Sequence, residues 1–128
     1  MALTVISNKP RTSAVFHVAG ANASIVVAGN NSVSNVAIGT EVLTGAYITQ
    51  TVWGCDGTGY IVVKRGTTPV AIYDSTGQHE YAGTGMPITV GQTADINVEF
   101  VGSANCFIMF EVQKLGPGLT ANSEYFQV

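Results

Sequence analysis

Apolar and polar residues alternate along most of this chain with a period of two. In the segment "ADINVEF" (94–100), for example, the apolar residues occupy every second position and the polar ones lie between them. Successive side chains of a β-strand point to opposite faces, so this spacing is typical of a strand with one buried face. No window keeps the 3.6-residue repeat of a helix, and turn residues recur about every eight to twelve positions. The pattern predicts an all-β protein.

The alternation predicts about eight or nine short strands. Strands this short bury their inner faces either as two packed sheets or as one closed sheet, and an antiparallel β-sandwich is the expected form. A jelly-roll-like topology is the first expectation and an Ig-like topology the second. Trp53 and Cys55 lie too close together for the cysteine and tryptophan pattern of true immunoglobulin domains. The candidate strands are residues 13–18, 24–28, 34–38, 46–53, 59–65, 70–74, 79–82, 94–100 and 106–112.

Turn residues between these strands suggest how they pair. Gly and Asp in "GCDGT" predict a hairpin loop between 46–53 and 59–65, and Gly66 predicts the next turn. With the strand "VAIYD", which ends at "STGQ", these elements are expected to form a three-stranded meander. The segments "ADINVEF" and "CFIMFEV" are expected to form a terminal hairpin. In the second of them, one face carries Cys106, Ile108, Phe110 and Val112. The opposite face, with Phe107, Met109 and Glu111, is also partly apolar and needs cover.

The chain divides into one domain with two extended ends. We expect an N-terminal arm at 1–12, a β-sandwich domain at 13–115 and a C-terminal arm at 116–128. The C-terminal arm opens with Gly-Pro-Gly and has no periodicity. It either packs back on its own sandwich or reaches onto a neighbour as an added strand or hook. Its apolar residues are the expected partner-binding residues: Leu119, Tyr125, Phe126 and Val128.

Charge is scarce in this sequence. Charged residues make up 10% of the chain, against about 25% in a typical globular protein. Such a surface suits contact with other proteins, although a Ser- and Thr-rich secreted domain would also fit. The five basic residues are scattered and the net charge is −3, whereas nucleic-acid binding needs concentrated Lys and Arg. The composition indicates no nucleic-acid partner.

The two cysteines stand in different surroundings. Cys55 lies in the turn-like segment "WGCDGTG" and Cys106 in an apolar strand, which predicts reduced, unpaired thiols. No export signal and no membrane-spanning apolar run is recognised. We therefore expect a protein made in a reducing compartment.

The titratable residues do not suggest catalysis. His17 is expected to be an ordinary strand residue. His79 and Glu80, near Asp74, point to opposite faces as neighbours in a strand, which is poor spacing for a shared metal ion. Cys55 has no recognisable base or oxyanion loop. We expect no enzymatic activity, no metal and no cofactor.

The single tryptophan is the remaining candidate for a binding site. Strict alternation puts Trp53 on one face with Thr49 and Thr51, and opposite Ile48 and Val52. One of these faces would then be available to a partner, which makes Trp53 a candidate partner-binding residue. The alternative is a tryptophan that belongs to the core.

The order of strands and turns in two segments resembles a known class of virion proteins. In "AYITQTVWGCDGTGYIVVKRGTTPVAIYDSTGQHEYAG", one strand ends in Trp before a Gly-Asp turn, the next runs into "KRG" and a third ends in Tyr-Asp. In "TADINVEFVGSANCFIMFEVQKL", a last hairpin closes on a Lys. Over about residues 41–115, this order resembles small virion structural proteins of tailed phages, especially those of marine podoviruses, and in particular head decoration or cement proteins.

The resemblance implies a noncatalytic protein of the capsid surface, assembled in the host cytoplasm. Its partners would be the major capsid protein and neighbouring copies of the chain, which it would bridge and reinforce against internal DNA pressure. The alternative is a glycan-binding module of a tail or fibre, with Trp53 or Tyr60 exposed beside polar acceptors. A shell protein is a further alternative, but 128 residues is short for a shell subunit of a tailed phage. Small RNA-phage coats match this length, but their RNA-binding sheet would call for more Lys and Arg than the five of this chain.

Overall fold

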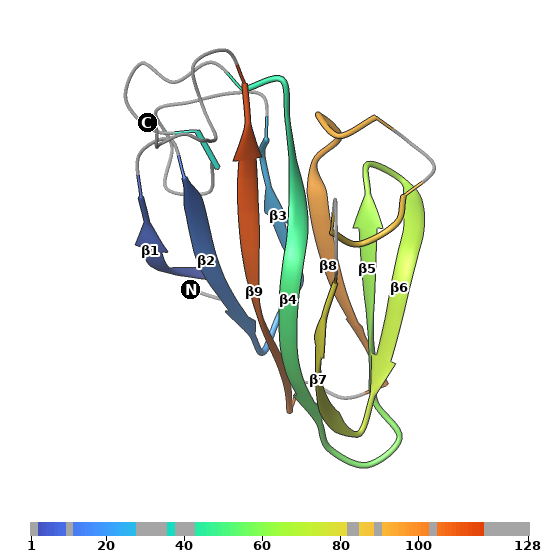
Figure 1. The fold of residues 1–128 in the computed structure, drawn as a ribbon. Helices are drawn as coiled ribbons and strands as arrows, with labels where there is room; N and C mark the ends of the chain where they lie inside the picture. The colour runs from blue at the N-terminus through green and yellow to red at the C-terminus, as the bar shows by residue number, and fades with distance from the viewer. Residues whose placement is uncertain are drawn as a thin grey trace.

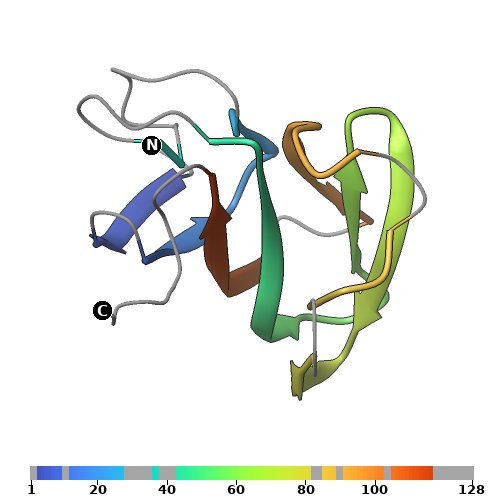
Figure 2. The ribbon, with the colours of Figure 1, turned by 45° about the horizontal axis from the view of Figure 1, so that its top comes forward.

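The fold consists of two antiparallel β-sheets that face each other across a single core (Figures 1 and 2). The structure is a computed structural model. The residues that it describes form nine strands and no helix. The all-β sandwich expected from the alternation is therefore confirmed. The residues described are 3–9, 12–27, 36–37, 43–81, 85–88, 91–102 and 105–116.

Five strands form one sheet and four form the other. Sheet 1 has the order β1 (Leu3–Asn8), β2 (Ser13–Ala19), β9 (Cys106–Leu115), β4 (Gly45–Cys55) and β7 (Thr76–Glu80). Sheet 2 has the order β3 (Ala23–Ile25), β8 (Ile96–Val101), β5 (Tyr60–Arg65) and β6 (Thr68–Asp74). The two longest strands, β4 and β9, lie side by side in sheet 1 (Figure 1).

The chain crosses repeatedly from one sheet to the other. β2, β4, β7 and β9 lie in sheet 1, whereas β3, β5, β6 and β8 lie in sheet 2. The resulting order, 2-9-4-7 opposite 3-8-5-6, is that of an eight-stranded jelly roll, and β1 adds an edge strand. An immunoglobulin sandwich, with strands ABED on one sheet and CFG on the other, does not give this order.

Two of the expected pairings are wrong, because successive strands enter different sheets. The turn after Cys55 carries the chain from β4 in sheet 1 to β5 in sheet 2, so only β5 and β6 of the expected meander form a hairpin. Likewise, β8 pairs with β5, and β9 pairs with β2 and β4. The turn expected at "STGQ" is confined to Ser75, which has a φ of 57°, and the following residues begin β7.

Part of the segment expected to be an N-terminal arm lies in the sandwich. Leu3–Asn8 forms β1 and pairs with β2, with Leu3 and Val5 packed against the core. In the expected strand 34–38, residues 36–37 are buried but belong to no strand, and the others lie outside the described residues.

The core lies between the inner faces of the two sheets. Phe16 on β2 and Phe110 on β9 are buried with their ring centroids 5.8 Å apart. The alternation in "ADINVEF" and "CFIMFEV" identified the inward side of both strands correctly. The fully buried aliphatic residues on these and neighbouring strands are Val18, Ile25, Ile48, Ile61, Val63, Ile96, Val98, Ile108 and Val112.

A buried arginine joins the two sheets at one end of the core. Arg65, the last residue of β5, is 1% exposed. Its guanidinium donates hydrogen bonds to the carbonyl oxygens of Ala46 on β4 (2.9 Å), Gln92 (2.5 Å) and Ala94 (3.1 Å). Burial lowers the pKa of Arg65, and the carboxylate of Asp95 opposes this change. Arginine nevertheless stays charged in proteins, so the three bonds are charge-assisted.

Replacement of Arg65 by Met should destabilise the fold strongly. Three carbonyl oxygens would lose a guanidinium donor, although Gln92 O would keep the N–H of Ala46 at 3.1 Å. We expect the free energy of unfolding to fall by about 3–5 kcal/mol in urea denaturation. The control is Lys64→Met, which removes a partly exposed ion pair with Glu99 and should change stability by less than about 1 kcal/mol. Similar losses for the two variants would contradict the assigned importance of Arg65.

Candidate interaction surface

A bulge in β4 decides which side chains face outward from sheet 1. Ile48 pairs with Val112 and Gln50 pairs with Glu111, so Thr49 is an extra residue between them. Beyond this residue the alternation changes sides. Thr51 is buried, whereas Gln50 and Val52 line an outer depression. The expectation from strict alternation is therefore wrong for the second half of β4.

Because of the bulge, Trp53 faces the space between the sheets. It is half-buried and packs on Tyr73 of β6, with ring centroids 4.2 Å apart. Its indole N–H donates a hydrogen bond of 2.9 Å to the carbonyl oxygen of Asp74. Its ring also lies against Gly77 of β7, where an added Cβ would sit 2.7 Å from Cζ2. The ring is engaged largely by its own chain, and contact with a partner stays a prediction.

An aromatic cluster continues from Trp53 toward the β7 edge. The hydroxyls of Tyr73 and Tyr81 are 2.5 Å apart, and Tyr81 packs on His79 with ring centroids 4.2 Å apart. Burial raises the pKa of Tyr73, so its hydroxyl stays protonated and able to donate at neutral pH. The cluster thus links Trp53 and His79 of sheet 1 with Tyr73 of sheet 2 through Tyr81.

The outer face of sheet 1 carries an apolar surface over its central strands. Met109 on β9 lies opposite Val52 on β4 and His17 on β2. A shallow depression of about 140 Å³ is lined by Met109, Val52 and Val15, together with Gln50, Phe110 and Glu111. We call Val15, Val52, Phe107 and Met109 the sheet 1 apolar face. Phe107 is exposed and the other three are partly exposed.

Phe107 is the most exposed aromatic side chain of this face. It is 37% exposed, its ring lies on Gly54, and it stacks on His17 with centroids 5.8 Å apart and planes 23° apart. An added Cβ at Gly54 would be 2.7 Å from the phenyl ring. His17 is thus a strand residue that supports an exposed aromatic ring.

Acidic residues border one side of the sheet 1 apolar face. Gln50 pairs with Glu111 on one side and with Glu80 on the other, so the three side chains form a row across β9, β4 and β7. The hydroxyl of Thr49 donates a hydrogen bond of 2.9 Å to Glu111 Oε1. A hollow of about 400 Å³ lies over this row. No group of three potential metal ligands is found among the described residues.

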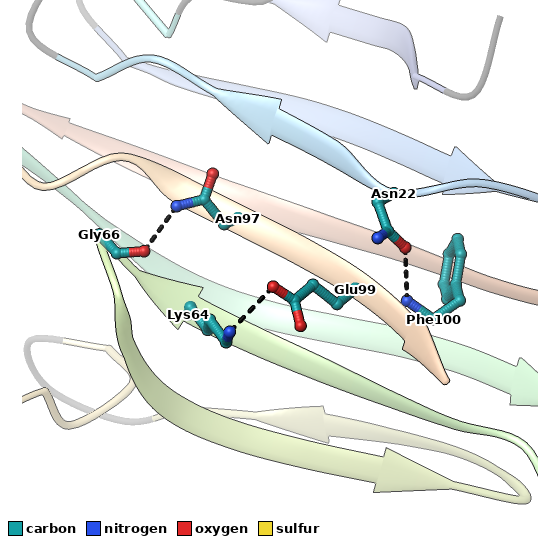
Figure 3. Close-up of polar contacts among 6 residues, drawn as sticks. All are labelled: Asn22, Lys64, Gly66, Asn97, Glu99 and Phe100. Atoms are coloured by element: carbon teal, nitrogen blue, oxygen red, sulfur yellow. Dashed lines mark hydrogen bonds and ion pairs between the residues drawn. The ribbon is translucent and has the colours of Figure 1, made fainter. Parts of the chain in front are cut away.

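The outer face of sheet 2 is organised differently, because its polar groups pair with one another (Figure 3). Lys64 and Glu99 form an ion pair at 2.9 Å, and the amide of Asn97 donates to the carbonyl of Gly66 at 2.6 Å. Asn22 accepts a hydrogen bond from the backbone N–H of Phe100, 2.9 Å away. This N–H lies past the end of the short strand β3. Lys64, Glu99, Asn97 and Asn22 therefore have partners within the chain itself.

A second hollow lies at the end of sheet 2 beside the turn between β4 and β5. It has a volume of about 390 Å³ and is lined by Tyr60, Ile72 and Asp74, with Ser75 and residues 57–59. Tyr60 is 37% exposed and Ile72 is 66% exposed. Gly57 has a φ of 63°, and Gly59 N–H donates to Asp56 O at 3.2 Å, so the glycine-rich segment is a turn.

The expected arm residues are not placed by the structure. Leu119, Tyr125, Phe126 and Val128 lie outside the described residues. β9 runs without interruption to Leu115, whose carbonyl accepts a hydrogen bond from Thr44 N–H at 2.8 Å. The residues that sequence reasoning missed are Val15 and Val52. Their outward position depends on strand pairing and on the bulge, neither of which the alternation reveals.

Comparisons with known proteins identify no relative, so a function can be inferred only from the structure itself. No protein-family model, curated protein or solved structure matches the chain. Within the described residues, no helix has the length and hydrophobicity needed to cross a membrane.

Replacement of Gly77 by Ala should displace Trp53. The new Cβ would overlap the indole ring, and we expect a loss of about 1–3 kcal/mol in unfolding free energy. Because Trp53 is the only tryptophan, its emission spectrum reports the change directly. Gly91→Ala is the matched control, since its Cβ would meet nothing closer than 3.8 Å. Unchanged stability and emission in the Gly77 variant would show that the indole does not occupy this position.

Proposed function

We propose that this protein is a noncatalytic structural component of a phage virion that binds the outer surface of the capsid and stabilises the shell by bridging subunits. The observation that carries the proposal is the sheet 1 apolar face. It spans the three central strands of the larger sheet, where Phe107 is exposed and Val15, Val52 and Met109 are partly exposed. Apolar surface that stays accessible to solvent is a feature of interaction sites.

Burial of this face would supply the driving force for binding. A Val, Met or Phe side chain contributes about 1.5–3 kcal/mol when it passes fully from water to an apolar contact. The members of the sheet 1 apolar face are only partly exposed, so each would add less than this. Association also loses translational and rotational freedom. A single contact is therefore expected to be weak, and simultaneous binding to adjacent subunits would strengthen it.

The expected arm residues supply a second contact in this proposal. Leu119, Tyr125, Phe126 and Val128 follow directly from β9, the strand that contributes Phe107 and Met109 to the sheet 1 apolar face. An arm of thirteen residues, 116–128, can extend up to about 45 Å from the end of the sandwich. That reach is enough to contact a neighbouring subunit or another copy of the chain. The major capsid protein is the proposed partner.

Charge supports the orientation of the protein on the shell. The carboxylates that point outward from the described strands of sheet 1 are Glu80 and Glu111, both on one side of the apolar face. Basic groups of the partner beside this row would fix the register of docking. Sheet 2, with its internal ion pair and amide bonds, would face solvent.

A glycan-binding module is the second candidate, and the hollow beside Tyr60 favours it. An exposed aromatic ring stands there with Asp74 and Ser75, which could accept hydrogen bonds from sugar hydroxyls. Jelly rolls occur among both capsid and lectin domains, so the fold agrees with either candidate and selects neither. The first is preferred because Trp53, the stronger candidate for sugar stacking, is packed against Tyr73.

Replacement of Met109 by Lys should abolish shell binding. Met109→Lys puts a charge in the middle of the sheet 1 apolar face, and desolvation of that charge on docking opposes association. Ile72→Lys is the control, because Ile72 is 66% exposed and lies on the other sheet. Cosedimentation with capsids purified without the protein should fall at least tenfold for the first variant and stay unchanged for the second. Equal binding of both would contradict the proposed orientation.

Removal of the arm should also weaken shell binding while leaving the fold intact. A chain ending at Gly116 keeps all of β9, so its circular dichroism spectrum and cooperative melting should match those of the full chain. Its cosedimentation with shells should be reduced, because only the contact with sheet 1 remains. Binding equal to that of the full chain would show that the arm makes no contact.

The glycan alternative predicts a different response. Tyr60→Ala should abolish any oligosaccharide binding measured by calorimetric titration, because the ring lines the hollow. The same variant should leave shell cosedimentation unchanged. Saturable oligosaccharide binding that Tyr60→Ala abolishes, together with no shell binding by the full chain, would favour the alternative over the capsid proposal.

A further inference from the structure

The two cysteines lie directly opposite each other across the central strands of sheet 1. Cys55 is the last residue of β4 and Cys106 is the first residue of β9, and the register pairs them. Both are free thiols in this structure, Cys106 buried and Cys55 half-buried. The sequence suggested unrelated surroundings for them, because the extension of β4 to Cys55 was not recognised.

The backbone bonds show which kind of pair they form. Cys55 N–H donates to Ser75 O at 2.6 Å, and Cys106 O accepts from Gly20 N–H at 3.3 Å. The N–H of Cys55 and the carbonyl of Cys106 thus point away from the opposite cysteine, as in a non-hydrogen-bonded antiparallel pair. The Cα atoms of such pairs are about 4.5 Å apart and their side chains approach closely. Disulfides span Cα separations of about 4.4–6.8 Å, so this position accommodates one.

We propose that Cys55 and Cys106 are a disulfide-forming pair that closes when the protein meets a low-molecular-weight disulfide. The bridge would fix the end of the β4 and β9 ladder, next to the turn that leads to Tyr60. It would close a loop that contains β5, β6, β7 and β8. This inference rests on the strand register and the backbone hydrogen bonds of the two cysteines, and it is independent of the proposed function.

The reaction is a double thiol–disulfide exchange. The Cys55 thiolate, which belongs to the less buried thiol, attacks one sulfur of the small disulfide and releases one small thiolate. The Cys106 thiolate then attacks Cys55 Sγ in the mixed disulfide and releases the second. The two protons lost by the cysteines end on the two released thiols. The cysteine pair is oxidised and the small disulfide is reduced to two thiols.

The surroundings of Cys55 make this reaction slow at neutral pH. Burial raises the pKa of Cys55 to about 12, and the hydrogen bond and charge of Cys106 and the carboxylate of Asp74 act in the same direction. The thiolate is the attacking species, so the rate should rise about tenfold per pH unit below that pKa. The raised pKa also means that stability of the reduced protein declines as pH rises above the ordinary cysteine value near 9.0.

Oxidised glutathione is a direct probe of the pair. The reduced full chain is incubated with it under native conditions at pH 9, and intact mass, thiol content and melting temperature are measured. We expect a mass loss of two hydrogens, loss of both thiols, a peptide joining positions 55 and 106, and a Tm increase on the order of 10 °C. Unchanged thiols, glutathione adducts that persist on the wild-type chain, or disulfide-linked dimers would overturn the proposal.

The single variants test the order of the two exchanges. Cys106→Ser removes the resolving thiol, so it should trap one glutathione on Cys55 and show no increase in Tm. Cys55→Ser leaves only the more buried thiol and should react more slowly than Cys106→Ser. Rapid modification of Cys106 in that variant would overturn the assigned order. The wild-type measurement decides whether the bridge forms even if a variant fails to fold.

Discussion

The extra residue in β4 is the constraint on which the rest of the structure depends. Ile48 O accepts from Met86 N–H and Thr49 O accepts from Tyr81 N–H, both at 2.8 Å, so neighbouring segments hold the bulge. Without it, strict alternation from Ile48 would turn Val52 inward and Trp53 outward. The outward position of Val52, the packing of Trp53 on Tyr73 and the juxtaposition of the cysteines all follow from this one shift of register.

Local patterns therefore predicted the strands far better than their pairing. The period-two alternation located most strands and identified the inner faces of β8 and β9, because burial of one face imposes it directly on the sequence. The pairing is non-local: β2 lies beside β9, and the hairpins expected from adjacent strands give way to crossings between sheets. The bulge and β1 were missed because Thr49 resembles any strand residue and because Leu3–Asn8 precedes the first obvious turn.

The candidate surface was only partly visible for the same reason. Phe107 and Met109 were recognisable because "CFIMFEV" is apolar on both faces. Val15 and Val52 come from strands that pair with β9 over long sequence distances, so only the register shows that they join the same face. The buried position of Arg65 was equally hidden, since its partners are backbone carbonyls, which carry no sequence signal.

β9 links the features to which we assign function. Outward, it presents Phe107 and Met109, and inward it contributes Cys106 and Phe110 to the interior of the sandwich. Strands on both sides pair with it over most of its length, so its position is fixed more firmly than that of an edge strand. A force applied to the segment after Leu115 would pass along this strand into the ladders with β2 and β4. The proposed arm would be joined to the most firmly paired part of sheet 1, which would suit the proposed role of holding adjacent subunits together.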